Sequence, residues 1–346
     1  MKKSVLIISS ILIIFLGCYT SKKVPFSKKN KLNSSCAKEL NQYQNYSIYL
    51  ENDTINYHIY PKINIDSINN LIIYVQGSGP SPLFKVKKEG NSTWIYGSMP
   101  FDLDEIPEDY LFVLISKKGI PFCIDYDENY IAPPKYYENE TLDYRANQVD
   151  IVIKDLLTLK KNSEFSKVVV LGHSEGSDVI AKVGTINEDI THFGYWSGSG
   201  NSQWYDFPLF VRQQVNKGEI SEEESIIQMD SLLSQYRDIM ANKDNIEKSW
   251  LGNSYKRWYY FSEPPIKNLL QINKPIFVAM GTADKSVPIE SIYLVPIEFI
   301  RHGKTNLSFN IYPHLDHSLN KIEENGEIER YWNKIFLEFL NWVKKN

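Results

Sequence analysis

A serine between two glycines follows an apolar, β-branched segment near the middle of the chain. The segment is Val168–Leu171, and Gly172–Gly176 (Gly-His-Ser-Glu-Gly) comes directly after it, with Ser174 at its centre. A serine hydroxyl is a weak nucleophile unless a base lies beside it and backbone N–H groups face the site of attack. A strand, a sharp turn and a helix would present it in that way, and glycines beside the turn let strand and helix pack closely. We therefore predict that Ser174 is a nucleophile; the alternative is a Gly/Ser turn without a chemical role.

Two further residues complete a set that could transfer an acyl group. His317 is the best placed of the six histidines, because it lies in a loop just past the last predicted strand. Asp284 follows the preceding predicted strand, and a carboxylate there can orient the imidazole and stabilise its charged form. Both positions fall at the carboxyl ends of strands, where the active sites of open α/β folds lie. The neighbouring Asp316 is expected to cap a turn instead.

The elements that would carry these residues are apolar runs separated by amphipathic segments. Runs buried on both faces are typical of parallel strands, and their alternation with helices predicts an α/β fold with a mostly parallel sheet and helices on both faces. Residues 46–60 alternate and predict a hairpin, and an apolar stripe from Ile328 to Val343 predicts a terminal amphipathic helix. The expected strands are Leu71–Val75, Leu111–Ile115, Val168–Leu171, Phe193–Trp196, Pro275–Met280 and Leu307–Tyr312, with a helix from Asn147 to Leu157.

Between residues 201 and 270 the strand pattern stops, and acidic helix-favouring stretches alternate with aromatic clusters. We interpret this range as a helical cap insertion over the edge of the sheet where the loops gather; a peripheral helical subdomain is the alternative. Aromatic residues here and in the 126–137 loop could hold an apolar part of a substrate, or could simply pack. Arg145 could pair with a substrate carboxylate, although an ion pair within the fold is the favoured interpretation. The candidates for substrate binding are Tyr130, Tyr136, Arg145, Trp204 and Trp258.

The order Ser174, Asp284, His317 and the motifs around these residues resemble the α/β-hydrolase superfamily. The resemblance extends from Tyr46 to the terminal helix. The chain looks especially like bacterial secreted or lipoprotein members of the dienelactone-hydrolase, acyl-thioesterase and S9-like peptidase branches. This resemblance implies an α/β-hydrolase fold.

The resemblance also implies an oxyanion hole made of backbone N–H groups. One comes from Glu175, the residue after the nucleophile, and the other from Ser78 or Gly79 in the loop after an early strand. The sequence departs from the superfamily at Gln76, since this loop commonly starts with His-Gly. The backbone donors are unaffected by that change, and it leaves open how the loop is braced.

Together these features predict a serine hydrolase that cleaves a carboxylic ester or related acyl bond through an acyl-enzyme. The alternatives are a serine peptidase, an acyl thioesterase or acyltransferase, and a non-catalytic surface protein that binds a partner with the same fold. We expect a small acyl substrate and no cofactor or metal, since no HExxH or clustered His/Cys spacing is present. The formal net charge of -4 gives no basic footprint for nucleic acid.

The first residues predict export. A basic start, the apolar stretch Val5–Leu16 and a small residue before Cys18 describe a signal peptide over residues 1–17. Phe15–Cys18 resembles the lipobox of bacterial lipoproteins, so we expect a lipid on Cys18 that holds the protein at a bacterial membrane, in the periplasm or at the cell surface. Plain secretion and an uncleaved anchor are the alternatives. A Lys-, Ser- and Asn-rich tether is expected over 18–40, followed by the hydrolase domain over 41–346.

Two cysteines remain in the predicted domain and tether, namely Cys36 and Cys123. An even number in an oxidising compartment is compatible with a disulfide. No spacing rule supports the pairing, so we expect two separate thiols, with the disulfide as the alternative. Neither has the surroundings of a catalytic cysteine.

Overall fold

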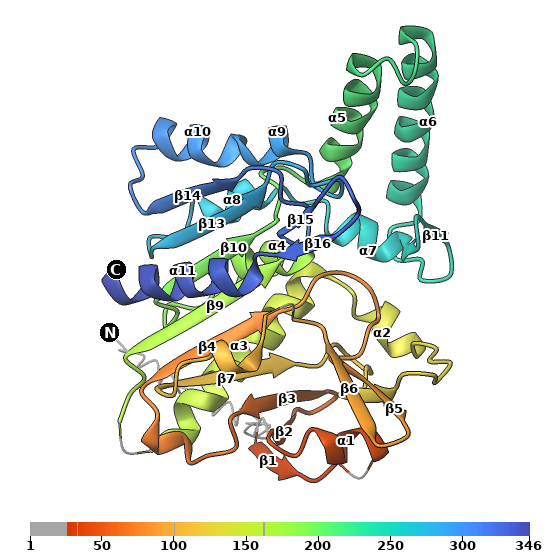
Figure 1. The fold of residues 1–346 in the computed structure, drawn as a ribbon. Coiled ribbons are helices and arrows are strands. Elements are labelled where there is room, and N and C mark those ends of the chain that lie inside the picture. The colour runs from red at the N-terminus through yellow and green to blue at the C-terminus, as the bar shows by residue number, and fades with distance from the viewer. Residues whose placement is uncertain (1–25, 33, 100, 162) are drawn as a thin grey trace, which may run out of the picture.

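A nine-stranded, mostly parallel sheet forms the centre of the protein (Figure 1). The computed structural model describes residues 26–32, 34–99, 101–161 and 163–346, so the predicted signal peptide and Cys18 lie outside the described residues. The first three strands of the chain form an antiparallel series, and the third of them pairs antiparallel with the next strand of the sheet. From that strand to the far edge every pair is parallel. In spatial order the strands are β1 (Phe26–Asn30), β2 (Gln44–Tyr49), β3 (Thr54–Tyr60), β7 (Tyr110–Ile115), β4 (Asn70–Val75), β9 (Lys167–His173), β10 (His192–Trp196), β13 (Ile276–Gly281) and β14 (Leu307–Tyr312).

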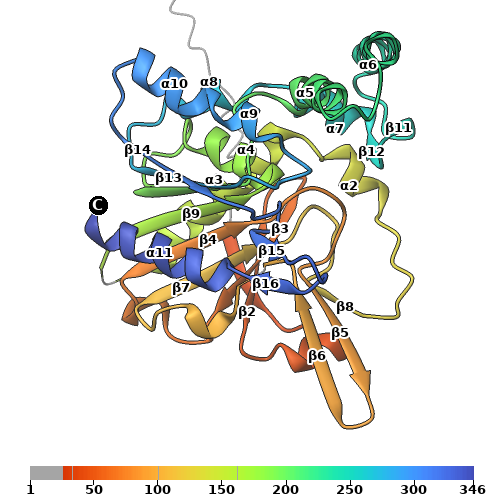
Figure 2. The same cartoon turned by 45° about the horizontal axis from the view of Figure 1, so that its top comes forward.

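Both faces of the parallel part are buried, because successive side chains of a strand point to opposite faces. Along β4, Leu71 and Ile73 pack into one core cluster, whereas Ile72 and Tyr74 pack into the other. Helices cover the sheet on both sides (Figure 2), which confirms the predicted α/β architecture. The first cluster contains side chains of α3 (Leu142–Leu159), α4 (Glu175–Val183), α8 (Pro265–Leu269), α9 (Ile289–Ile292) and α10 (Leu294–Arg301), and the second contains side chains of α1 (Ser35–Glu39) and α11 (Trp332–Lys345).

The C-terminal helix begins later than its apolar stripe predicted. Ile328 belongs to β16 (Ile328–Arg330), which pairs antiparallel with β15 (Asn320–Ile322), and α11 starts only at Trp332. Gly326 has a φ of +83° in the turn of this hairpin, a conformation that a glycine adopts readily. The turn brings the chain back as a strand, so Ile328 does not join the helix.

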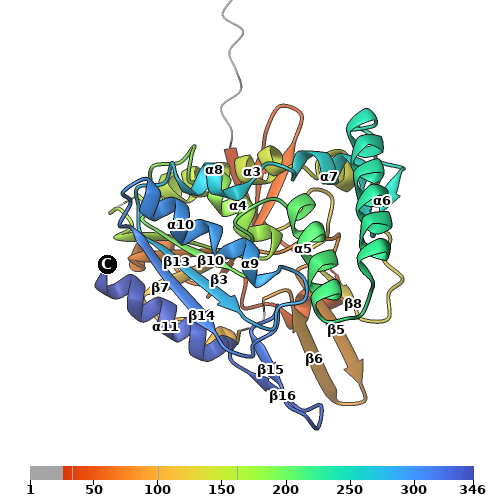
Figure 3. The same ribbon diagram turned by 90° about the horizontal axis from the view of Figure 1, so that it is seen from above.

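The range 201–270 is mostly helical, as the sequence predicted. α5 and α6 lie side by side and rise at the edge of the sheet where the parallel strands end (Figures 1 and 3). At the start of α6, Ser221 and Glu224 form a capping box, which satisfies backbone N–H groups of the first turn. The elements of this range before α8 are α5 (Gln203–Asn216), α6 (Glu222–Ala241), β11 (Ser249–Trp250), β12 (Asn253–Ser254) and α7 (Tyr255–Tyr260).

The segment before residue 41 is not a free tether where the structure describes it. β1 pairs antiparallel with β2 at the edge of the central sheet, and α1 buries Cys36 in the core. Lysines are common on edge strands, because they discourage pairing with another chain. The composition of this segment therefore looks like that of a tether although its backbone is paired.

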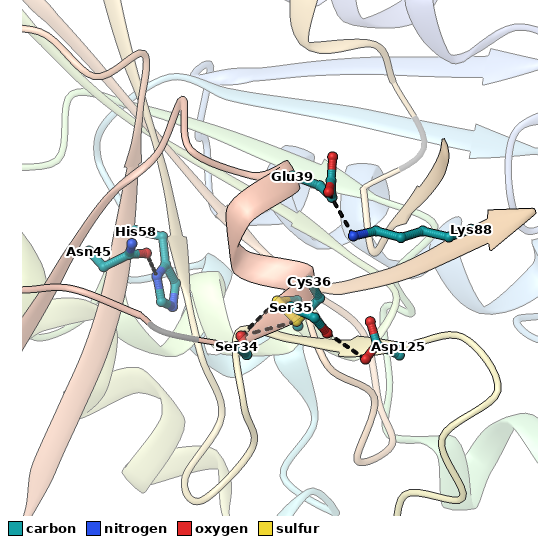
Figure 4. Close-up of a disulfide and its surroundings, with 9 residues drawn as sticks. Ser34, Ser35, Cys36, Glu39, Asn45, His58, Lys88 and Asp125 are labelled. Carbon is teal, nitrogen blue, oxygen red and sulfur yellow. Dashed lines mark hydrogen bonds and ion pairs between the residues drawn. A yellow bond between two sulfur atoms is a disulfide. The ribbon is translucent and has the colours of Figure 1, made fainter. Parts of the chain in front are cut away.

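A disulfide joins Cys36 to Cys123, with their Cα atoms 6.0 Å apart (Figure 4). The expectation of two separate thiols was therefore wrong. The pairing depends on a small second sheet that brings Cys123 beside α1, and the two cysteines are 87 residues apart in sequence. The elements of this region are β5 (Phe84–Glu89), β6 (Ser92–Gly97), β8 (Cys123–Asp125) and α2 (Pro134–Glu138), and the 3₁₀ helices are Ile65–Ser67 and Leu103–Glu105.

Candidate active site

The loops that carry the predicted residues meet at one edge of the sheet. The strand order reverses at β4, which has β7 on one side and β9 on the other. In open α/β sheets, ligands bind in the crevice outside the carboxyl ends of the strands at such a reversal. Ser174 follows β9, the loop 76–80 follows β4, and Asp284 and His317 follow β13 and β14.

Ser174 lies in a strained turn between β9 and α4. Its φ of 57° and ψ of −129° are unusual for an L-residue, and such a conformation costs of order 1–3 kcal/mol and clusters at functional sites. The N–H of Ser174 donates to the carbonyl of Trp196 at 3.0 Å, which ties the turn to β10. A Cβ at Gly172 would lie 2.3 Å from the carbonyl oxygen of Gly176, and one at Gly176 would lie 2.0 Å from that of Val75. Close packing of strand and helix therefore requires both glycines.

Asp284 and His317 form a hydrogen-bonded pair. His317 Nδ1 lies 2.8 Å from Asp284 Oδ2, and the carboxylate is completely buried. The other oxygen, Oδ1, accepts from the backbone N–H groups of Ser286 at 2.7 Å and Val287 at 2.9 Å, which fixes its orientation. Because an ionised carboxylate only accepts, the proton of the neutral imidazole lies on Nδ1 and Nε2 is left as an acceptor. This is the tautomer that a general base needs.

His173 links the serine turn to the loop of His317. The two imidazole rings are 5.0 Å apart, and His173 Nε2 donates to the carbonyl of His317 at 2.8 Å. Burial, and then the nearby His317, lowers the pKa of His173 to about 3, so this ring is neutral at pH 7. Within the described residues, no hydrogen bond joins the hydroxyl of Ser174 to His317. Catalytic hydrogen bonds are often long before a substrate binds, so the arrangement is compatible with a base that engages Ser174 in the complex.

The loop after β4 lies directly against the serine. A Cβ at Gly77 would be 3.2 Å from Ser174 Cβ and 3.6 Å from its Oγ. The carbonyl of Gln76 accepts from Arg145 at 2.7 Å, and Lys117 donates to the carbonyls of Gly77 and Gly79. These cations brace the loop in the absence of the usual histidine.

Glu175, which follows the nucleophile, sends its side chain into a buried ion cluster. It binds Arg145 Nη1 at 2.5 Å and Arg257 through Nε at 2.8 Å and Nη2 at 2.7 Å. Burial alone would raise the pKa of this carboxyl, but Arg257 and Arg145 outweigh it and lower the pKa to about 2. The backbone N–H of Glu175 thus belongs to a residue that three contacts hold in place.

The predicted substrate-binding residues lie in packed clusters. Tyr130 and Tyr136 pack together with Ile120 and Ala132, and the hydroxyl of Tyr136 donates to Glu140. The favoured interpretation of Arg145 as part of an ion pair is confirmed. Most aromatic residues of the insertion pack against one another and against Ile239. The aromatic members of this cluster are Trp204, Phe207, Tyr236, Trp250, Tyr255, Trp258 and Tyr259. These contacts account for the aromatic residues as a local core.

Three cavities flank the site, and the one of about 820 Å³ is lined by Asp284. The two others lie beside the loops of Ser78 and His317. One, of about 590 Å³, lies between the β5–β6 and β15–β16 hairpins and includes Ser318 and Trp332 in its lining. The other, of about 330 Å³, is lined by Ser78 and other residues of the loop after β4. Tyr96 lines both cavities. Sequence reasoning missed this surface because the hairpin that carries Tyr96 comes from a part of the chain without a chemical motif.

The remaining predicted and missed residues have structural roles around the site. Asp316 caps a turn, as predicted, since its Oδ1 accepts from the N–H groups of Ser318 at 2.9 Å and Asn320 at 2.8 Å. Lys117 and Arg257 were not anticipated. Arg257 precedes an aromatic run, and Lys117 lies two residues after a buried strand. A charged residue in either place was the signal that the sequence offered.

The strand order, and the meeting of these loops at one sheet edge, are those of an α/β-hydrolase fold. Residues 252–346 match the model of the dienelactone hydrolase family, and this range includes Asp284 and His317. The C-terminal part of the chain is therefore similar to the dienelactone hydrolases. No curated protein sequence matches the chain.

Several solved structures are similar in fold. The Pyrococcus horikoshii acylaminoacyl peptidase superimposes with a TM-score of 0.55 at 13% identity, over 89% of this chain and 42% of that chain. The chain thus spans less than half the length of that peptidase. Acetyl xylan esterase 1 from Thermoanaerobacterium is also similar, with a TM-score of 0.46 at 12% identity over 91% of this chain and 86% of that chain. Est1E from Butyrivibrio proteoclasticus has a TM-score of 0.46 at 12% identity over 87% of this chain and 99% of that chain.

Proposed function

We propose that the protein is a serine hydrolase that cleaves a carboxylic ester, or a related acyl bond, through an acyl-enzyme. The observation that carries the proposal is the strained Ser174 turn at the same sheet edge as a buried Asp284 that is hydrogen-bonded to His317. A binding protein would not need a strained backbone at Ser174. A buried carboxylate that is hydrogen-bonded to an imidazole is the arrangement of a general base.

The proposed reaction has two acyl transfers. His317 Nε2 takes the proton of the Ser174 hydroxyl while Oγ bonds to the acyl carbon, and the oxyanion that forms is held by the N–H groups of Glu175 and Ser78. Collapse of this intermediate breaks the bond to the leaving group, which takes the proton from His317. A water molecule then attacks the acyl-enzyme in the same way, releasing the acid and restoring the serine. Loss of one oxyanion donor costs about 3–4 kcal/mol of transition-state stabilisation.

A peptidase is the second candidate, because the acylaminoacyl peptidase of Pyrococcus horikoshii shares the fold. A screen of the purified protein with p-nitrophenyl esters of increasing acyl length, aromatic esters, acyl thioesters and aminoacyl-nitroanilides separates the candidates. We expect hydrolysis of oxygen esters at a kcat/KM at least 10-fold above the amides and thioesters. Faster cleavage of the anilides would favour a peptidase, and equal hydrolysis by Ser174→Ala would contradict the proposed nucleophile.

We propose in addition that the protein is exported and held at a bacterial membrane by a lipid on Cys18. The support is the sequence alone: a basic start, an apolar core and a cysteine after a small residue. No helix among the described residues is long and apolar enough to cross a membrane. Metabolic labelling with a palmitate analogue should disappear in Cys18→Ser, and labelling that persists in this variant would contradict the anchor.

A further inference from the structure

Lys117 is a buried cation that binds the backbone of the loop beside the nucleophile. It lies just after β7, and β7 pairs in parallel with β4, so the loops that follow these two strands are neighbours. Its Nζ donates to the carbonyl of Gly77 at 2.6 Å and to that of Gly79 at 2.6 Å. Only 5% of the residue is exposed, and an ammonium group is rarely buried to this degree without a specific role.

These two contacts fix the direction of one particular N–H group. In a trans peptide, the carbonyl of one residue and the N–H of the next point in opposite directions. The carbonyl of Gly77 points to Lys117, so the N–H of Ser78 points away from it. The carbonyl of Gly79 belongs to the peptide with Pro80, which has no N–H. Of the two peptides that Lys117 holds, only that of Ser78 can therefore donate a hydrogen bond.

The loop needs such a brace because of its composition. A Cβ at Gly77 would press on Ser174, and Gly79 has a φ of +84°, so both positions favour glycine. Two glycines leave a loop with many accessible conformations and a large entropic cost of ordering. A single charged donor that binds two carbonyls at once selects one of these conformations.

We propose that Lys117 is a positioning residue for the oxyanion hole: its contacts with Gly77 and Gly79 orient the peptide whose N–H, from Ser78, stabilises the oxyanion. This inference rests on the proposed serine hydrolase. Lys117 does not touch the substrate, so it acts on the rate of acyl transfer rather than on substrate binding.

Both basic and acidic side chains surround Lys117. Arg145 of α3 and Arg257 of α7 repel it, whereas Glu175 of α4 and Glu140 attract it, and the ring of Tyr136 lies 5.9 Å from Nζ. Burial, followed by Arg145, lowers the pKa of Lys117 to about 7. The charge of Lys117, and with it the strength of its hydrogen bonds to Gly77 and Gly79, therefore depends near neutral pH on the charges of these neighbouring side chains.

The test compares Lys117→Met with Lys118→Met in turnover of p-nitrophenyl acetate by the purified protein. Lys118 is the adjacent lysine and pairs with Asp53, and the carbonyls of Gly77 and Gly79 are bound by Lys117. We expect kcat of Lys117→Met to fall by about 10- to 100-fold with KM changed less than about threefold, since misorienting one donor costs part of its full effect. Lys118→Met should keep kcat within about twofold.

Wild type and Ser174→Ala are measured first, so that the two proposals fail separately. Turnover that does not depend on Ser174 would overturn the proposed function, and this inference with it. Ser174-dependent turnover with an unchanged kcat in folded Lys117→Met would overturn the inference alone. If Lys117→Met does not fold by circular dichroism, Lys117→Gln serves instead: its amide reaches less far, so an intermediate kcat supports the inference and a wild-type kcat contradicts it.

Discussion

Replacing Arg257 by methionine tests the ion cluster behind the serine turn. The side chains of Arg257 and Glu175 are 2% and 1% exposed, and two hydrogen bonds of 2.8 and 2.7 Å join them. Breaking a buried pair by removing one partner costs about 3–5 kcal/mol, because the other charge stays in the interior. Glu175 keeps Arg145 at 2.5 Å, so the expected loss lies at the lower end, at about 3 kcal/mol. Methionine replaces most of the apolar stem, so little of this loss comes from a cavity.

Arg212→Met is the matched control. Arg212 also pairs with a glutamate, Glu222, at 2.6 Å, but the two side chains are 52% and 64% exposed. Exposed pairs contribute little, so we expect the free energy of unfolding of this variant to stay close to that of wild type. Urea unfolding followed by circular dichroism gives both free energies of unfolding. A difference between the two variants below about 1 kcal/mol would refute the argument that the buried Arg257–Glu175 pair stabilises the fold much more than an exposed pair does.

Three further predictions concern the disulfide, the base and a buried histidine. Cys36→Ser/Cys123→Ser should lower the free energy of unfolding by about 2–4 kcal/mol because it releases a long loop, whereas a midpoint in urea equal to that of wild type would speak against a disulfide. His317→Ala should abolish turnover of p-nitrophenyl acetate, and the exposed His314→Ala should keep most of it; the opposite result would mean that the base is His314. Burial lowers the pKa of His58 to about 3, whereas the unfolded chain takes up a proton at this histidine below about pH 6.5. As the pH falls through this range, proton uptake favours the unfolded chain, and His58 lowers the free energy of unfolding by up to about 1.4 kcal/mol per pH unit. His58→Gln should flatten this slope between pH 6.5 and 4, and an unchanged slope would count against a neutral His58.

The central sheet could be predicted because its strands are apolar on both faces. Runs such as Leu71–Val75 and Leu111–Ile115 leave no polar face, so only a position between helices suits them. The serine turn was visible for a similarly local reason: Gly172 and Gly176 are required where strand and helix touch. Hydrophobic periodicity and glycines at close backbone contacts can therefore be recognised directly in the sequence.

Contacts between residues far apart in the chain could not be predicted in this way. Cys36 contacts Cys123 because a small second sheet brings them together, and Glu175 of α4 pairs with Arg257 of the insertion. Neither pairing can be inferred from the local spacing of residues. The segment Phe26–Asn30 looked like a tether because an edge strand tolerates lysines. The aromatic residues of the insertion were candidates for substrate binding, but they pack against one another, since a helical insertion needs a core of its own.

The site of covalent modification by a fluorophosphonate probe tests directly whether Ser174 is the nucleophile. This reagent reacts with a serine that a general base activates. After incubation of the purified protein, digestion and mass spectrometry, we expect one phosphonylated peptide, with the modification on Ser174, and no modification of folded Ser174→Ala. Modification at another serine, or none in folded wild-type protein, would contradict this role of Ser174.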